Sequence, residues 1–148
     1  MPNSCHRALL VATFAFMPCV PLLAQGGATV TGSHANEEFC KAMLKQADLS
    51  AAYMKANPGP VRDTTRQANY FGEQKALNAT LVKTAPASLS SDIVNFTRTS
   101  NAFFDVMGGR VGDSEAKMVA TRAMSSPEHI AASKRMSDYC GFKKSASK

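Results

Sequence analysis

Cysteine is the residue type in this 148-residue chain whose chemistry is most easily assigned. Cys5 and Cys19 fall within an N-terminal segment typical of a secretory signal peptide, so export would leave Cys40 and Cys140. In an oxidising compartment such a pair is expected to form a disulfide. The chain contains no Cys-x-x-Cys motif, and no histidine has zinc-ligand spacing to a cysteine. We therefore expect a structural disulfide and no metal site.

A second chemistry to consider is the binding of haem or another flat, lipophilic ligand. Tyr53 is a candidate axial ligand, because tyrosine serves this role in some haem proteins, and His129 is a candidate from the end of the chain. The competing interpretation gives Tyr53 a buried ring with an exposed hydroxyl and places His129 on the surface. We expect no cofactor and keep the haem or lipophilic carrier as the alternative.

Familiar catalytic patterns are missing from the sequence, which has no His-Glu-x-x-His and no Gly-x-Ser-x-Gly motif. The glycine-rich residues 108–112 lack a preceding strand and a following lysine, so they are interpreted as a turn. The candidate acid/base carboxylates, such as Asp48, Glu73, Asp92 and Asp105, lie in amphipathic helices and are expected to be solvated. We predict no catalytic residues and a chain that is not an enzyme. Two Asn-x-Thr sequons, at Asn78 and Asn95, leave the question of glycosylation open.

The N-terminus has the organisation of a signal peptide over residues 1–24, with a weakly basic start and an uncharged apolar run. Cleavage after Ala24 and cleavage after Ala28 both fit. A retained anchor is the alternative, disfavoured because two prolines interrupt a run that is short for a membrane span. We expect a flexible lead at residues 25–35 and a protein that is secreted or held in the periplasm or cell envelope.

The formal charge of +6 falls to +5 when Arg7 leaves with the signal. Lys143, Lys144 and Lys148, in a basic tail at residues 143–148, supply three of these charges and suggest weak contact with an anionic envelope. The other charges alternate in sign along the helices. This mixture disfavours a nucleic-acid surface, which needs clustered basic residues.

Five helical segments, separated by glycine and proline breaks, are expected over residues 36–142, and no strand pattern is apparent. Their expected bounds are about Glu37–Lys55 with Asn36 as cap, about Thr64–Lys83 with Asp63 as cap, Ser90 or Ser91 to Met107, about Ser114–Met124 with Asp113 as cap, and a last helix from Ser126 as cap to Cys140. We predict an all-α fold of one domain, a four- to five-helix bundle.

Apolar spacing predicts which face of each helix is buried. In the last helix this face is expected to carry Ile130, Ser133, Met136 and Cys140. The expected faces of the first three helices are Phe39, Met43, Ala47, Ala51 and Met54; Tyr70, Leu77, Leu81 and Thr84; and Leu89, Ile93, Phe96, Ser100, Phe103 and Met107. Gly72, in the second helix, is expected to allow close packing of a neighbouring helix.

A Cys40–Cys140 disulfide would join the first turn of the first helix to the last turn of the last helix. The two Cα atoms must then lie within about 7 Å. An even up-and-down arrangement could leave these ends far apart, so the bond selects topologies that bring the start and the finish of the bundle together.

Several short motifs resemble those of small secreted actinobacterial proteins of unknown function. They are Glu38-Phe39-Cys40, Ala85-Pro86-Ala87 followed by Asp92-Ile93, Ser125-Ser126-Pro127-Glu128, and Tyr139-Cys140-Gly141-Phe142. The resemblance implies export and a helical fold, and adds no chemistry. A weaker similarity is to mycobacterial haemophores, whose Tyr-x-x-x-His-Pro stretch is matched by residues 53–58 except for the histidine. From sequence we expect a secreted, non-enzymatic binding protein, whose partner is an unknown protein or a small lipophilic ligand.

Overall fold

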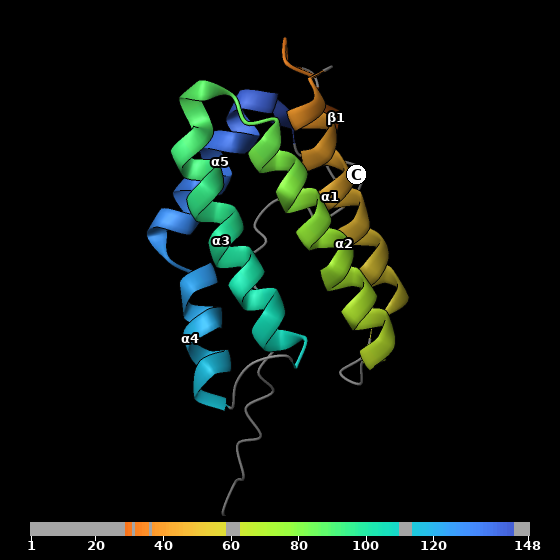
Figure 1. Cartoon of the computed structure of the whole chain (residues 1–148). Coiled ribbons are helices and arrows are strands. Elements are labelled where there is room, and N and C mark those ends of the chain that lie inside the picture. Colours follow the sequence, from red (N-terminus) through yellow and green to blue (C-terminus); the bar gives the residue numbers. More distant parts are fainter. Residues whose placement is uncertain (1–28, 31, 36, 59–62, 110–113, 144–148) are drawn as a thin grey trace, which may run out of the picture.

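Five α-helices make up most of the described protein (Figure 1). The computed structural model describes residues 29–30, 32–35, 37–58, 63–109 and 114–143. The helices are α1 Glu38–Ala56, α2 Thr64–Lys83, α3 Ser90–Met107, α4 Ser114–Met124 and α5 Pro127–Cys140, with a short 3-10 helix at Ala87–Leu89 before α3. The predicted all-α bundle is confirmed. The signal peptide, both cleavage positions, and the caps Asn36 and Asp113 lie outside the described residues.

Capping residues explain why the helix ends were predictable. The carboxylate of Asp63 accepts hydrogen bonds from the backbone N–H groups two and three residues further on, at 2.9 and 3.1 Å. Ser126 caps α5 in the same way, with Pro127 at the first helical position. Gly141 ends α5 in the left-handed conformation, at φ 67°, which glycine adopts without steric cost.

The five helices form four antiparallel columns (Figure 1). In chain order, α1 and α3 run away from the disulfide end of the molecule, and α2 runs back towards it. Both α4 and α5 also run back towards that end, one after the other along α3, so together they form the fourth column. An even number of antiparallel columns puts the first and last helix ends at the same end. The expectation that an even arrangement could separate these ends was therefore wrong.

The disulfide between Cys40 and Cys140 closes this end of the bundle. Its Cα atoms are 5.5 Å apart, and both cysteines are fully buried. They belong to the larger apolar cluster, which is drawn from α1, α2, the 3-10 turn, α3 and α5. Its buried members are Phe39, Cys40, Ala42, Met43, Leu81, Leu89, Ile93, Met136 and Cys140.

A smaller apolar cluster lies towards the far end of α3. It consists of Phe103, Ala120 and Met124, with partly buried side chains from the last turns of α3 around it. Between the two clusters, α1, α2 and α3 are joined by a polar belt. We use this name for Gln46, Ser50, Gln74, Asn78 and Asn101, which are connected by hydrogen bonds.

The described part of the lead contacts the closed end of the bundle. Thr29–Val30 forms a two-residue strand, β1, that pairs antiparallel with β2 at Phe142–Lys143. Gly32 lies against the last turn of α5, since a Cβ there would be 2.9 Å from the carbonyl oxygen of Cys140. Lys143, which was assigned to the basic tail, therefore has its backbone in this strand pair. Lys144 and Lys148 lie outside the described residues.

No helix in the described ranges has the length and apolar character needed to cross a membrane.

Candidate binding groove between α3 and α5

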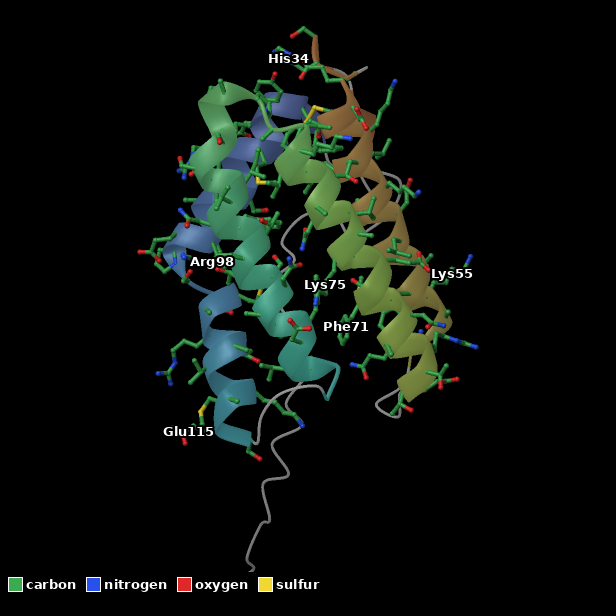
Figure 2. All side chains as sticks on the ribbon, in the orientation of Figure 1. His34, Lys55, Phe71, Lys75, Arg98 and Glu115 are labelled. Atoms are coloured by element: carbon green, nitrogen blue, oxygen red, sulfur yellow. A yellow bond between two sulfur atoms is a disulfide. The ribbon has the colours of Figure 1, made fainter. Side chains whose placement is uncertain are left out.

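An open groove of about 660 Å³ runs between α3 and the first half of α5. Apolar and polar groups both line it. Phe96 provides an aromatic surface, and Asn95, Thr99 and Ser126 add amide and hydroxyl groups. Arg98, labelled in Figure 2, lies on the side of α3 that faces α5. The groove is therefore suited to a ligand that is partly apolar and carries polar groups.

His129 is the most deeply buried ionisable residue in the groove, with 5% of its surface exposed. Its ring stacks on Phe96, with centroids 4.5 Å apart and an interplanar angle of 12°. The Nδ1 atom is buried and has no hydrogen-bond partner within the described part of the chain. Burial lowers the pKa of His129 below its usual value of 6.5, because the charged form loses its hydration. The ring is consequently neutral near pH 7.

The burial of His129 contradicts the expectation that it would be a surface residue and that Ile130 would face the core. Ile130 is instead 39% exposed. The disulfide explains the difference, because an α-helix turns by about 100° per residue and Cys140 fixes the buried face. On this wheel Met136 lies about 40° and His129 about 20° to one side of Cys140, whereas Ile130 lies about 80° to the other. The more hydrophobic side chain thus points away from the core.

An ion pair spans the groove further along the same helices. Arg135 donates two hydrogen bonds to Asp92, from Nε and from an Nη atom, each 2.6 Å long. This bidentate geometry lowers the pKa of Asp92, mainly through the hydrogen bonds from Arg135. The pair and the ring stack therefore hold α5 against α3 at two successive levels.

Tyr53 lies outside this groove. It is on α1 and stacks on Tyr70 of α2, with centroids 4.2 Å apart. Its hydroxyl is buried and has no hydrogen-bond partner among the described residues, so the expected exposed hydroxyl was wrong. The α1–α2 pair and the α3–α5 pair lie on different sides of the bundle (Figure 1). The structure thus does not bring Tyr53 and His129, the two residues named for haem, together.

The polar belt was not identified from the sequence. Gln46 donates to Asn78 at 2.7 Å, and Asn78 donates to Asn101 at 2.7 Å. Gln74 donates to Ser50 at 2.9 Å. Apolar spacing along α1 and α2 placed Met54 and Leu77 on the buried faces instead. A buried polar residue does not contribute to an apolar pattern, so this method cannot detect it. The sequence does contain one signal for the belt. Gln74 and Asn78 are four residues apart, so two hydrogen-bonding side chains share one face of α2.

Two neighbouring contacts hold α2 against α3 on the side of the polar belt that is further from the disulfide. Lys75 forms an ion pair with Asp105 at 2.8 Å, and Phe71 stacks on Phe104 with centroids 5.1 Å apart. Figure 2 shows Lys75 and Phe71 directed from α2 towards α3. Both contacts are interhelical packing and create no reactive arrangement.

In the part of the chain that the structure describes, no group of three or more His, Cys, Asp or Glu side chains could hold a metal ion. No protein-family model, curated protein or solved structure matches the chain.

Proposed function

We propose that this chain is an exported, non-enzymatic binding protein of the cell envelope or the extracellular space, and that it binds its partner in the α3–α5 groove. The observation that carries the proposal is the groove itself. Its volume of about 660 Å³ is within the usual range for small-molecule sites, about 300–1,000 Å³. The partner is a small lipophilic ligand, or a protein segment that inserts an apolar side chain.

The composition of the groove supports binding rather than turnover. The Nδ1 atom of His129 has no hydrogen-bond partner within the described residues, and Asp92 is held by Arg135. A general base needs its proton-accepting atom within reach of a nucleophile and is usually oriented by a third group. The groove instead presents an aromatic surface and ionic edges. These groups suit recognition.

Binding can be tested by NMR with indole, benzoate and oleate, three probes that differ in charge and apolar length. The amide signals of α3 and of the first half of α5 should shift on addition of at least one probe. Ala131 lines the groove, so Ala131→Trp should fill it and abolish the shifts. Ala123 is exposed on α4 and does not line the groove, so Ala123→Trp is the matched control. Shifts centred elsewhere, or unchanged in Ala131→Trp, would refute the assignment.

Export and the absence of catalysis have separate tests. The intact mass of the exported protein should match cleavage after Ala24 or Ala28, and should increase by two hydrogens on reduction. A full-length mass would contradict the signal peptide. Reproducible hydrolytic or redox turnover by the purified protein would contradict a non-enzymatic role.

A carrier of haem or another lipophilic ligand is the second candidate. It is favoured by one observation: His129 stacks on the aromatic surface of Phe96, and its Nδ1 atom has no hydrogen-bond partner among the described residues. Hemin titration should then produce a Soret shift that His129→Ala removes. Because Tyr53 stacks on Tyr70 away from the groove, Tyr53→Phe should leave the shift unchanged. The absence of any Soret shift would eliminate the haem carrier.

A further inference from the structure

We infer that acid opens the α3–α5 groove: protonation of His129 separates the first turns of α5 from α3, while the disulfide keeps the far end of α5 in place. The inference rests on the proposed function only for its consequence, which is release of the bound partner at low pH. The opening itself is a property of the described chain and can be measured without a ligand.

The closed groove disfavours a charged imidazole for two structural reasons. His129 is 5% exposed, and its Nδ1 atom has no partner to share a positive charge in the described structure. It is also the third residue of α5 after the Ser126 cap, at the positive end of the helix dipole, where a cation is destabilising. Opening the helix end would restore hydration to the ring and remove this cost.

The charged groups around His129 do not compensate. Among the described residues, four of them line the groove: Asp92 and Arg98 from α3, and Glu128 and Arg135 from α5. Asp92 is engaged by Arg135, and both arginines repel an imidazolium. Glu128 is exposed, so solvent and salt weaken its attraction. No charged residue in the described part of α4 lines the groove. The closed form therefore holds the neutral ring.

The two ends of α5 are held differently. At the far end, Cys140 is bonded to Cys40 and fully buried, and Tyr139 donates a hydrogen bond to Glu37 of the α1 cap at 2.9 Å. The near end is joined to α4 by a short connection and held to α3 by the His129–Phe96 stack. Loss of that stack should therefore move the near end only, because the Asp92–Arg135 ion pair and the disulfide still hold the rest of α5.

The coupling between proton binding to His129 and opening of the groove determines how much the open population increases at low pH. If the open imidazole has the ordinary pKa of 6.5, the open population can rise by at most about 30-fold at pH 5.0, the limit in which the closed ring binds no proton. At pH 7.5 the increase in the open population due to protonation is a factor close to one. Asp92 remains ionised at pH 5.0, because hydrogen bonds from Arg135 lower its pKa. The opening thus precedes any loss of the ion pair.

The test is hydrogen exchange of the full chain at pH 7.5 and pH 5.0, with each rate divided by its intrinsic value. Amides 128–132 should exchange faster at pH 5.0, by up to about 30-fold, and amides 136–140 should change less than twofold. A change below twofold in 128–132, or an equal rise in 136–140, would overturn the inference.

Three variants test whether the faster exchange at low pH depends on the imidazole of His129. His129→Phe keeps a flat ring against Phe96 but cannot take a proton, so residues 128–132 should lose their response to acid. His129→Gln gives a second non-titrating side chain should the first variant fold poorly. His34→Gln removes the other described histidine, at the opposite end of α5, and should respond as the natural chain does. A response that persists in His129→Phe refutes the switch, whether or not the groove binds a ligand.

Discussion

Gly72 lies in the middle of α2, where no described atom beyond its chain neighbours and the adjacent backbone of α2 is within 4 Å of the position that a Cβ would occupy. The expected close packing of a neighbouring helix was therefore wrong, and the glycine only adds flexibility to the unfolded chain. Gly72→Ala should raise the free energy of unfolding by about 1 kcal/mol, measured by urea denaturation. Gly32→Ala is the contrasting variant and should destabilise, because its Cβ would meet the Cys140 carbonyl. A neutral or destabilising Gly72→Ala would disprove this account.

Asn78 and Asn95 are both in glycosylation sequons, but their surroundings differ. Asn78 is 1% exposed, and its amide both accepts from Gln46 and donates to Asn101. Asn78→Ala leaves these two groups without a partner, so the free energy of unfolding should fall by about 2 kcal/mol or more. Asn95 is exposed, so Asn95→Ala should change it by less than about 0.5 kcal/mol. Equal effects of the two substitutions would contradict a structural role for the belt.

The different exposure of Asn78 and Asn95 also predicts which of the two can be glycosylated in the folded chain. A glycan on Asn78 would require the belt to open, whereas Asn95 is accessible at the edge of the groove. In a host that glycosylates exported proteins, we expect the folded chain to carry a glycan on Asn95 only. Peptide mapping of the secreted chain would locate it, and occupancy of Asn78 in folded material would show that this reasoning is wrong.

At the scale of the helices, α5 shows that a single constraint selects the buried face. Its disulfide turns His129 inward and leaves Ile130 exposed. Ile130→Gln should therefore cost less than about 1 kcal/mol of stability, whereas Met136→Ala, at a fully buried site, should cost about 2–5 kcal/mol. Thermal unfolding of both variants measures the difference. If Ile130→Gln lost more stability than Met136→Ala, Ile130 would belong to the buried face of α5, as its hydrophobicity predicts.

The helix ends were predictable from sequence, and the helix faces only in part. Asp63 and Gly141 act through neighbouring backbone groups, so their effect is local and visible in the sequence. The belt depends instead on hydrogen bonds between α1, α2 and α3, and a partner such as Asn101 is identifiable only after the helices are packed. Hydrophobic spacing placed the core well in α3, where Ile93 and Phe103 are buried as predicted. The groove was not predicted, because it is formed by two helices far apart in sequence.

At the scale of the whole molecule, the disulfide closes a loop with a sequence separation of 100 residues. It connects the first and last helices, and because the closed loop is long, it strongly reduces the conformational freedom of the unfolded chain. Replacing Cys40 and Cys140 by alanine should lower the free energy of unfolding by about 4–5 kcal/mol. Urea denaturation of the double variant, compared with the oxidised chain, gives the value. A loss below about 1 kcal/mol would mean that packing alone closes the bundle.

Acid should weaken the whole molecule in two stages, the first on protonation of a neutral imidazole and the second on protonation of negatively charged carboxylates. Burial lowers the pKa of His129, so the folded state favours the neutral ring, and stability begins to fall as pH drops below the ordinary value of 6.5. Hydrogen bonds from Arg135 lower the pKa of Asp92, and hydrogen bonds, the largest from His34, lower that of Glu37. The stability from these carboxylates is present above their ordinary values of 3.8 and 4.5, and is lost as pH falls through the lowered values.

The two stages can be separated by urea midpoints measured at pH 7.5, 5.0 and 3.0. The natural chain should lose stability between pH 7.5 and 5.0 and again between 5.0 and 3.0. His129→Phe should flatten the first interval and leave the second, because it removes the proton acceptor but not the carboxylates. Asp92→Asn should reduce the loss in the second interval only, since Arg135 then has no carboxylate to be neutralised. If His129→Phe left the first interval unchanged, a group other than the buried imidazole would control the stability of the bundle near neutral pH.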